Sequence, residues 1–221
     1  MASSKEKDKA RGEEQLKNQI NLNPIKRLFG RFFGPTQRHI GPYLTKGQVA
    51  ADLGCGSGYY TLTLAECAGP EGRIYAVDLN ENHIRALEKK ADKRGYRNIE
   101  AHASSASNLS FIKDESVDFV LANGLLCNMA DHRQLAVNEI KRILKPTGQA
   151  YLGLGAPPPL GFVDRKEWEK ILEGFIVERK GGFLQKWAVV SKKNSDRHMS
   201  ANCVETTKHY RFLKLRKKLG E

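Results

Sequence analysis

Short apolar runs alternate with longer amphipathic stretches along the chain from residue 48 onward. The apolar runs predict β-strands at residues 49–53, 73–78, 98–102, 117–122, 149–154, 175–180 and 183–191. The amphipathic stretches predict helices at residues 59–68, 81–94, 131–144 and 164–173. Because strands and helices alternate with short links, the pattern favours an α/β fold with a doubly wound, mostly parallel sheet of seven strands.

Residue types at the ends of these segments support the predicted boundaries. Asp131 and Asp164 are suited to begin helices as N-caps, and Pro146 and Gly148 are expected to end the third helix. Residues 181–182 are both glycine, which favours a hairpin between the last two strands. That hairpin would make the last strand antiparallel to its neighbour.

The predicted sheet domain covers only part of the chain. Residues 48–193 are assigned to it, and residues 194–221 form a basic C-terminal extension. Residues 1–20 are expected to be a charged, flexible tail. Residues 21–47 carry apolar side chains near helical spacing and are expected to form an N-terminal lid helix over the domain.

Positive charge is concentrated in the two ends of the chain. The 221 residues carry a formal net charge of +12, whereas residues 48–190 are neutral. Residues 1–47 hold 10 basic and 4 acidic residues, and residues 191–221 hold 9 and 3. Such ends could contact an anionic membrane surface or RNA, or they could only keep the protein in solution. A neutral domain is untypical of dedicated nucleic-acid enzymes, which more often carry a basic stripe around the active face.

Composition narrows the class of protein further. Apolar residues make up 40% of the chain and charged residues 28%, which excludes collagen, a coiled coil and general disorder. No apolar run approaches the roughly 18 residues that span a bilayer, and no apolar leader follows the first residues. The four cysteines lie far apart, so neither a zinc site nor a disulfide scaffold is expected. We therefore expect a cytoplasmic protein without a metal.

The segment most informative about chemistry lies between the first predicted strand and the first predicted helix. It begins with Asp52 and contains Gly54, Gly56 and Gly58. Glycines there let the backbone turn sharply and approach a ligand, and the start of the helix offers free N–H groups. Asp78 ends the second strand, where a carboxylate can bind ribose hydroxyls. A glycine loop alone is weak support, but this loop and this acid together predict a nucleoside-containing cofactor.

Two kinds of cofactor compete for such a loop. A dinucleotide binder needs the pattern GxGxxG, but Tyr59 stands where the third glycine should fall. Asp52 lies just before the loop, and its negative charge would repel a pyrophosphate. The same charge suits a ligand that carries an ammonium and a sulfonium, so we favour such a ligand over a dinucleotide.

The chain resembles the class I S-adenosylmethionine-dependent methyltransferases, in particular the small type similar to ubiquinone and menaquinone C-methyltransferases. The resemblance rests on five segments, namely residues 49–61, 72–80, 98–111, 117–131 and 139–152. It implies a Rossmann-like domain and S-adenosylmethionine as the cofactor. These motifs are specific for cofactor and fold but say little about the methyl acceptor.

The resemblance also implies roles for individual residues. Asp78 is expected to bind both ribose hydroxyls, and Leu79 to cover one face of the adenine. Ser105, with Ser104 before it, stands where relatives usually have an acidic residue for the adenine amino group, so this contact would lack charge. The expected cofactor-binding residues are Asp52, Gly54, Cys55, Gly56, Gly58, Asp78, Leu79, Ser104, Ser105 and Asn123.

The sequence offers no obvious general base. Methyl transfer from a sulfonium needs one only when the acceptor atom carries a proton. His39 and Tyr43 lie in the predicted lid segment and are the candidates for contact with the reacting groups, since relatives often place a tyrosine of such a segment near the pocket. Cys127 is expected to serve in packing.

The expected activity is in-line methyl transfer from S-adenosylmethionine to a small molecule, with lipophilic acceptors among the candidates. Two alternatives stay open at this point. One is an RNA or protein methyltransferase recruited through the basic ends. The other is a cofactor-binding module without catalytic activity, which the serines at 104 and 105 and the missing base would fit. The sequence leaves the oligomeric state open.

Overall fold

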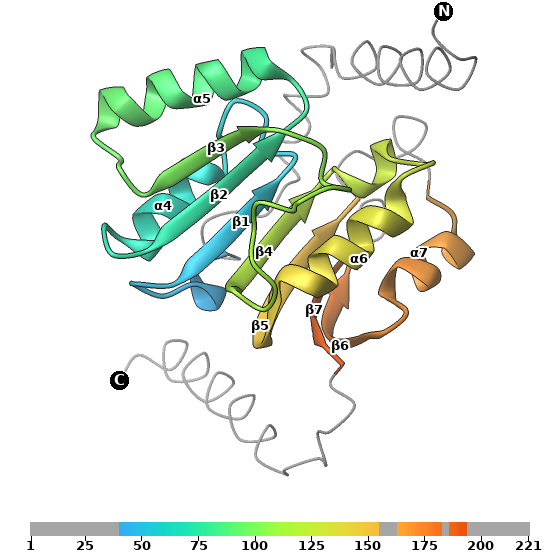
Figure 1. Ribbon diagram of the computed structural model, residues 1–221. Helices are drawn as coiled ribbons and strands as arrows, with labels where there is room; N and C mark the ends of the chain where they lie inside the picture. Colours follow the sequence, from blue (N-terminus) through green and yellow to red (C-terminus); the bar gives the residue numbers. More distant parts are fainter. Residues whose placement is uncertain (1–39, 155–162, 183–185, 194–221) are drawn as a thin grey trace, which may run out of the picture.

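A single sheet of seven strands forms the centre of the protein (Figure 1). The computed structural model describes residues 40–154, 163–182 and 186–193. The strands are β1 (Val49–Leu53), β2 (Arg73–Asp78), β3 (Ile99–Ala103), β4 (Val117–Asn123), β5 (Leu144–Gly153), β6 (Phe175–Gly181) and β7 (Trp187–Lys192). Their positions confirm the strand pattern of the sequence.

The strand order is β3-β2-β1-β4-β5-β7-β6. The pairs among β3, β2, β1, β4 and β5 are parallel, whereas β7 runs antiparallel to both β5 and β6. The doubly wound topology and the antiparallel last strand are thereby confirmed. β6 forms one edge of the sheet, and most of its side chains are exposed.

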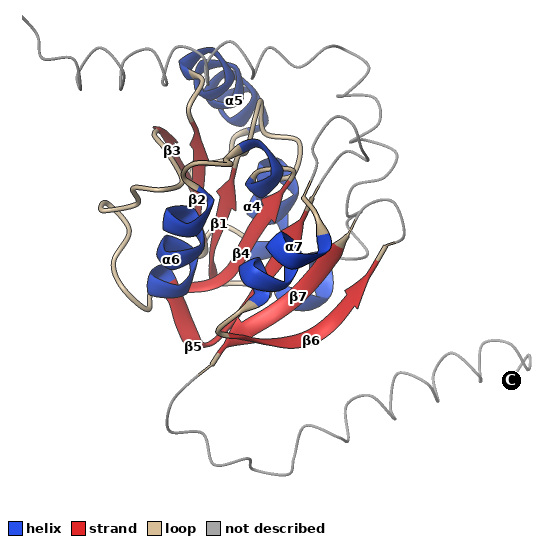
Figure 2. Cartoon of the chain, turned by 90° about the vertical axis from the view of Figure 1, so that its right-hand side faces the viewer, coloured by secondary structure: helices blue, strands red, loops and turns tan. Residues whose placement is uncertain are grey.

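Helices cover both faces of the sheet (Figure 2). The four longer ones are α4 (Thr61–Ala68), α5 (Glu81–Arg94), α6 (Arg133–Ile143) and α7 (Arg165–Leu172). α4 and α5 pack on one face, where Ile74 and Ala76 of β2 point. α6 and α7 pack on the other, where Tyr75 and Val77 point. The alternation of side chains along β2 thus separates two buried layers. In the described part of the chain, no helix is long and apolar enough to cross a membrane.

The helix α5 has local signals at both ends. Its N-cap Asn80 accepts a hydrogen bond from the backbone N–H of Asn82, and Gly95 ends it in the left-handed conformation. Ile84, Leu87 and Ala91 form its buried stripe. Both boundaries match the prediction because capping residues and apolar spacing agree.

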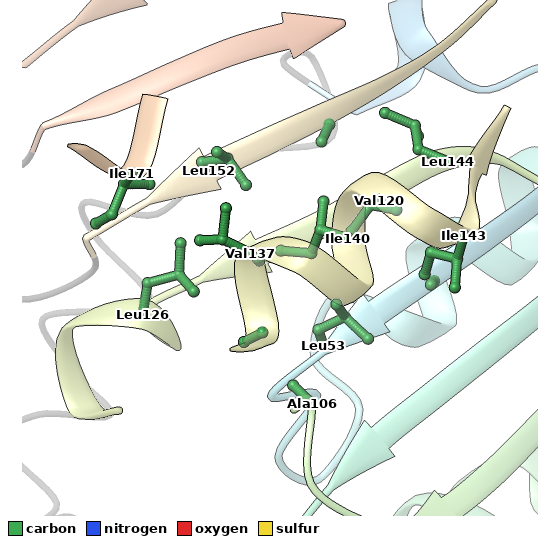
Figure 3. Packing of buried hydrophobic residues seen from close by; sticks show 14 of the residues in the cluster. Leu53, Ala106, Val120, Leu126, Val137, Ile140, Ile143, Leu144, Leu152 and Ile171 are labelled. Atoms are coloured by element: carbon green, nitrogen blue, oxygen red, sulfur yellow. The ribbon is translucent and has the colours of Figure 1, made fainter. Parts of the chain in front are cut away.

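The helix α6 anchors the larger buried layer (Figure 3). Val137 and Ile140 pack over β1, β4 and β5. The prediction that Asp131 caps this helix is wrong, because His132 occupies the N-cap position and no side chain caps the end. Asp131 itself is exposed. Tertiary packing of the apolar stripe, rather than a cap, therefore fixes where α6 begins.

The strand β5 begins earlier than the sequence predicts. α6 ends at Ile143, and the next residue, Leu144, already pairs with Val117 of β4. Residues 144–148 therefore belong to the strand, and Pro146 and Gly148 lie within it instead of ending the helix. The register shifts between Val117 and Phe119, which accommodates the extra residues as a bulge.

Several predicted segments lie outside the described residues. These are the charged tail at 1–20, the lid helix up to residue 39, the whole loop at 155–161 and the basic extension at 194–221. Of the lid segment, residues 40–47 are described. Ile40 and Leu44 are buried among the residues of the face that α4 covers.

The connection between β3 and β4, residues 104–116, contains no helix, and one arginine side chain holds it to α6. Arg142 donates hydrogen bonds to the backbone carbonyls of Leu109 and Ile112, at 2.7 and 2.8 Å. Glu139 accepts from the N–H of Leu109 at 2.6 Å and pairs with Arg142 at 2.8 Å. Hydrogen bonds from Arg142 lower the pKa of Glu139, so the pair stays charged.

Replacing Arg142 by alanine should therefore destabilise the domain. The substitution removes the side-chain donor from the carbonyls of Leu109 and Ile112, and Leu109 then keeps only the backbone N–H of Ile112 as a donor. The expected loss is about 2–3 kcal/mol of unfolding free energy. Urea denaturation at pH 7 measures it. Arg85→Ala is the matched control, because Arg85 is exposed and pairs only within α5. An equal loss in both variants would contradict this assignment.

Candidate functional site

Three neighbouring strands bring the predicted site residues to one edge of the sheet. β1, β2 and β4 are parallel, so their carboxyl ends lie side by side (Figure 1). Asp78 ends β2 and Asn123 ends β4, while the glycine loop leaves the end of β1. In open α/β sheets this edge is the usual place for a ligand.

The glycine loop is held against the neighbouring strand. The backbone N–H groups of Gly54 and Cys55 both donate to the carbonyl of Val77, at 2.8 and 3.0 Å. Gly58 has φ +85°, and a Cβ there would lie 2.4 Å from Leu87 Cδ1. Gly56 has φ +53°, and a Cβ there would meet no atom within 4 Å. The loop therefore needs glycine for packing at 58 and leaves its backbone open at 56.

The carboxylate of Asp78 organises the loop. Its Oδ2 accepts from the N–H of Gly56 at 2.8 Å, and its Oδ1 accepts from the N–H of Asn80 at 2.9 Å. Nδ1 of His83, on the first turn of α5, lies 3.2 Å from the same Oδ1. Asp78 is buried, with 9% of its surface exposed. This residue thus ties the end of β2, the loop and α5 together.

Asp52 is more deeply buried than Asp78. It is 2% exposed, and its Oδ2 accepts a hydrogen bond from the hydroxyl of Thr61 at 2.6 Å. Burial raises the pKa of Asp52 to about 7, and the negative charge of Asp78 adds to the effect. The carboxyl group lies at the start of α4, and it changes charge near neutral pH.

The two serines after β3 are tied into a turn. Ser105 Oγ lies 2.7 Å from Ser107 Oγ and accepts from the N–H of Ser107 at 3.2 Å. Ser104 donates its N–H to the carbonyl of Asp78, and its hydroxyl donates to the carbonyl of Asn108. Both serines therefore lie near the end of β2. Leu79, which follows Asp78, is half-buried.

Asn123 meets an aromatic side chain from the loop. Its Nδ2 lies 3.5 Å from the hydroxyl of Tyr60, which follows the glycine loop. Burial raises the pKa of Tyr60, so this hydroxyl keeps its proton at neutral pH. A Cβ on Gly153 of β5 would lie 2.4 Å from Asn123 Oδ1. Because residue 153 is a glycine without a side chain, the side chain of Asn123 can occupy this space.

The structure does not bring Tyr43 to this edge. The ring of Tyr43 stacks on Phe119 with centroids 5.9 Å apart, and Phe119 precedes the end of β4 by four residues. The hydroxyl of Tyr43 contacts Arg179 of β6. Tyr43 is thus packed on the face of the sheet, and its place among the reacting groups stays a prediction. His39 lies outside the described residues.

Sequence reasoning missed three residues of the site: Tyr60, Thr61 and His83. His83 is not singled out in the sequence analysis, and the structure places it beside Asp78 with only 24% of its side chain exposed. A signal was present, because Asn80 is a good N-cap and the third helical position turns back toward the preceding strand end. Tyr60 and Thr61 follow directly on the loop, so proximity in sequence could have identified them.

Metal-ligating side chains do not gather at this edge. Within residues 40–154, 163–182 and 186–193, no three His, Cys, Asp or Glu side chains could hold a metal ion together. Cys55 of the loop is buried, and burial raises the pKa of its thiol, so it stays protonated. Its Sγ donates to the carbonyl of Gly56. Cys55 therefore contributes packing and a backbone contact within the loop.

Part of the chain is similar to known methyltransferases. A family model described as "Methyltransferase domain" matches residues 50–148. Demethylmenaquinone methyltransferase from Geobacillus stearothermophilus is 37% identical over 103 residues, which are 47% of this chain and 43% of that protein. The chain spans about half the length of the curated relatives it matches.

Solved structures agree with this fold. A putative type 11 methyltransferase from Sulfolobus solfataricus is 29% identical with a TM-score of 0.52, and the match covers 69% of this chain and 88% of that one. A SAM dependent methyltransferase from Aquifex aeolicus is 22% identical with a TM-score of 0.62, and the match covers 80% of this chain and 98% of that one. At that identity the second similarity concerns the fold alone.

Proposed function

We propose that residues 50–148, which match the family model described as "Methyltransferase domain", form a class I S-adenosylmethionine-dependent methyltransferase domain, and that the chain transfers a methyl group from this cofactor to a small, lipophilic acceptor. One observation carries the proposal. The carboxylate of Asp78 stands at the end of β2 and accepts the N–H of Gly56, so the acid and the glycine loop form one unit. A ribose and the group attached to it would meet both parts together.

The residues at this edge fit S-adenosylmethionine. The loop backbone at Gly56 is open, because a Cβ there would meet no atom within 4 Å. A carboxylate has four hydrogen-bonding positions, and described residues occupy three of those on Asp78, which leaves one for a ribose hydroxyl. A buried acid, Asp52, lies behind the loop and offers negative charge to a cationic ligand.

In this proposal, each group of residues at this edge of the sheet binds a different part of the cofactor. Asp78 holds the ribose, and Leu79 covers one face of the adenine. Ser104 and Ser105 offer hydroxyl oxygens to the adenine amino group. The loop from Gly54 to Gly58, with Asp52 behind it, surrounds the methionine part.

S-adenosylmethionine, when bound, supplies a methyl group that is activated by a positively charged sulfonium. The chain has to hold an acceptor in line with that group and keep water away, which lowers the barrier by positioning. Asn123 and Tyr60 lie where β4 ends and can donate hydrogen bonds to an acceptor. Because the Tyr60 hydroxyl keeps its proton at neutral pH, it acts here as a donor and not as a base.

The proposed class of methyl acceptor is inferred from the names of the similar proteins. Proteins named demethylmenaquinone methyltransferase match this chain at 32–37% identity over about half of their length. A small, lipophilic acceptor follows if the chain shares their chemistry. In that case the basic ends at 1–47 and 191–221 would bring a cytoplasmic protein to an anionic membrane surface, where such acceptors lie.

Cofactor titration and a labelled-methyl assay test the proposal together. Calorimetry of the full chain with S-adenosylhomocysteine should give one site per chain. Incubation with labelled S-adenosylmethionine and a membrane lipid extract should then place label in the lipid fraction. The matched control is the variant Asp78→Ala, which should give neither signal.

Other outcomes would change the assignment in defined ways. Label in RNA or in protein, but not in lipid, would replace the small acceptor by a macromolecular one recruited through the basic ends. RNA binding through those ends would weaken steeply with salt. Binding of the cofactor without transfer to any of these pools would favour a non-catalytic module. Failure to bind S-adenosylhomocysteine at all would overturn the whole proposal.

A further inference from the structure

His83 occupies a hydrogen-bonding position on the residue that is proposed to hold the ribose. Its Nδ1 lies 3.2 Å from Asp78 Oδ1, and the imidazole is largely shielded from solvent. Among the residues that the structure describes, Asp78 accepts only from nitrogen, since its other two donors are the N–H groups of Gly56 and Asn80. His83 is the one side chain among these three donors.

The carboxylate of Asp78 has too few free hydrogen-bonding positions for both hydroxyls of a ribose. Each oxygen of an ionised carboxylate accepts about two hydrogen bonds. Oδ1 already accepts two, from Asn80 and His83, and Oδ2 accepts one, from Gly56. A ribose with two neighbouring hydroxyls needs two positions. One of the three donors must therefore leave before both hydroxyls can bind.

The imidazole of His83 is the donor that can leave. Gly56 and Asn80 donate from the backbone, and both segments are fixed, the first by the loop and the second by the start of α5. The contact of His83 is also the longest of the three. A side chain needs only a change of rotamer to release its partner, whereas a backbone N–H moves only with the chain.

We propose that His83 competes with one ribose hydroxyl for Asp78 Oδ1, so that it regulates cofactor affinity through its own protonation. The proposal rests on the function given above, because it needs the ribose at Asp78. His83 is here a positioning residue that acts through Asp78. A neutral imidazole is displaced by the hydroxyl, whereas an imidazolium holds the carboxylate in a stronger, charge-assisted hydrogen bond.

The direction with pH follows from that difference. Histidine side chains as a class gain their proton near pH 6.5. A protonated His83 holds Asp78 more strongly, and the cofactor then binds less well. Binding of the cofactor selects the neutral imidazole, so it releases protons in acidic solution.

Few other charged groups in the described residues bear on this imidazole. From β2 the carboxylate of Asp78 faces it, and from β1 Asp52 lies behind Asp78 and titrates near neutral pH. On α5 itself, Glu81 pairs with Arg85, and Lys90 donates to the backbone of the glycine loop. Asp52 is the second source of pH dependence, and it remains unchanged when His83 is replaced.

The experiment compares the full-length wild type with His83→Leu, which keeps a bulky side chain and removes the donor. Calorimetry with S-adenosylhomocysteine avoids the sulfonium charge. The wild-type Kd should be about tenfold larger at pH 5.5 than at pH 8.0, and in His83→Leu the ratio should fall to about twofold. At pH 6 in two buffers of different ionisation enthalpy, binding should release more protons from the wild type than from His83→Leu.

The control is His102→Asn, because His102 also pairs with a carboxylate, Glu100 at 2.9 Å, but on the next strand. This variant should keep the wild-type ratio and proton release. Equal pH ratios in the wild type and His83→Leu, or uptake of protons on binding, would overturn the proposal while the cofactor still binds. Absence of binding at every pH in the wild type would instead overturn the proposed function.

Discussion

Replacing Asp78 by alanine should weaken binding of S-adenosylhomocysteine at least about hundredfold. The carboxylate is expected to accept hydrogen bonds from the ribose, and hydrogen bonds to a charged group contribute about 1.5–3 kcal/mol each. The substitution also removes the acceptor that holds the N–H groups of Gly56 and Asn80, so the loop loses its fixed shape. Calorimetric titration at pH 8 measures the loss directly.

Two further variants separate loss of the contact from loss of the fold. Asp78→Asn keeps one acceptor oxygen and should bind with an affinity between those of the wild type and of Asp78→Ala. Asp118→Ala removes a comparable carboxylate at the opposite end of the sheet, where Asp118 accepts from Val49 and pairs with Lys145. This control should lose stability but keep its affinity within about twofold. Unchanged affinity in Asp78→Ala would refute the site.

Asp52→Asn should make the cofactor-free protein more stable at pH 8. Burial raises the pKa of Asp52 from 3.8 to about 7, so the folded state binds the proton more tightly than the unfolded state does. Stability therefore falls as pH rises from about 4 to 7 and stays level above that range. Three pKa units correspond to about 4 kcal/mol at most, and a gain of about 2–4 kcal/mol is expected at pH 8.

Denaturant titration of the cofactor-free protein at pH 5 and pH 8 tests this prediction. The amide oxygen of asparagine can still accept the hydrogen bond from Thr61, so the start of α4 keeps its partner. The gain should shrink at pH 5, where the wild-type carboxyl is already protonated. Asp118→Asn should behave oppositely and lose stability at pH 8, since it breaks the pair with Lys145. A variant Asp52→Asn less stable than the wild type at pH 8 would contradict the assignment.

Local signals made the core of the site predictable from sequence. The glycines of the loop and Asp78 lie at strand ends, and parallel neighbouring strands must bring their carboxyl ends together. The bounds of β2 and α5 were likewise predictable, because apolar spacing, Asn80 and Gly95 all agree there. In these cases the order of residues along the sequence was sufficient to predict the structure.

Other features depend on contacts between distant segments, which sequence patterns do not carry. Tyr43 packs on Phe119, a partner 76 positions later that no spacing rule identifies. Leu144 joins β5 because Val117 offers a pairing partner, which overrides the helical pattern before it. The contact between His83 and Asp78 could be predicted only if the direction of the first turn of α5 were known. In each case tertiary packing decided among locally possible conformations.

The exposed edge of the sheet has a consequence for solubility. β6 presents Ile176 and Val177 at 43% and 38% exposure, and an apolar edge of this kind can pair with the same edge of another molecule. Glu178, Arg179 and Lys180 follow directly and are also exposed. Charged side chains on an edge strand oppose such pairing, and the register shift beside Val177 disturbs the ladder further. Neutralising these three charges would remove one barrier to edge-to-edge pairing and favour aggregation.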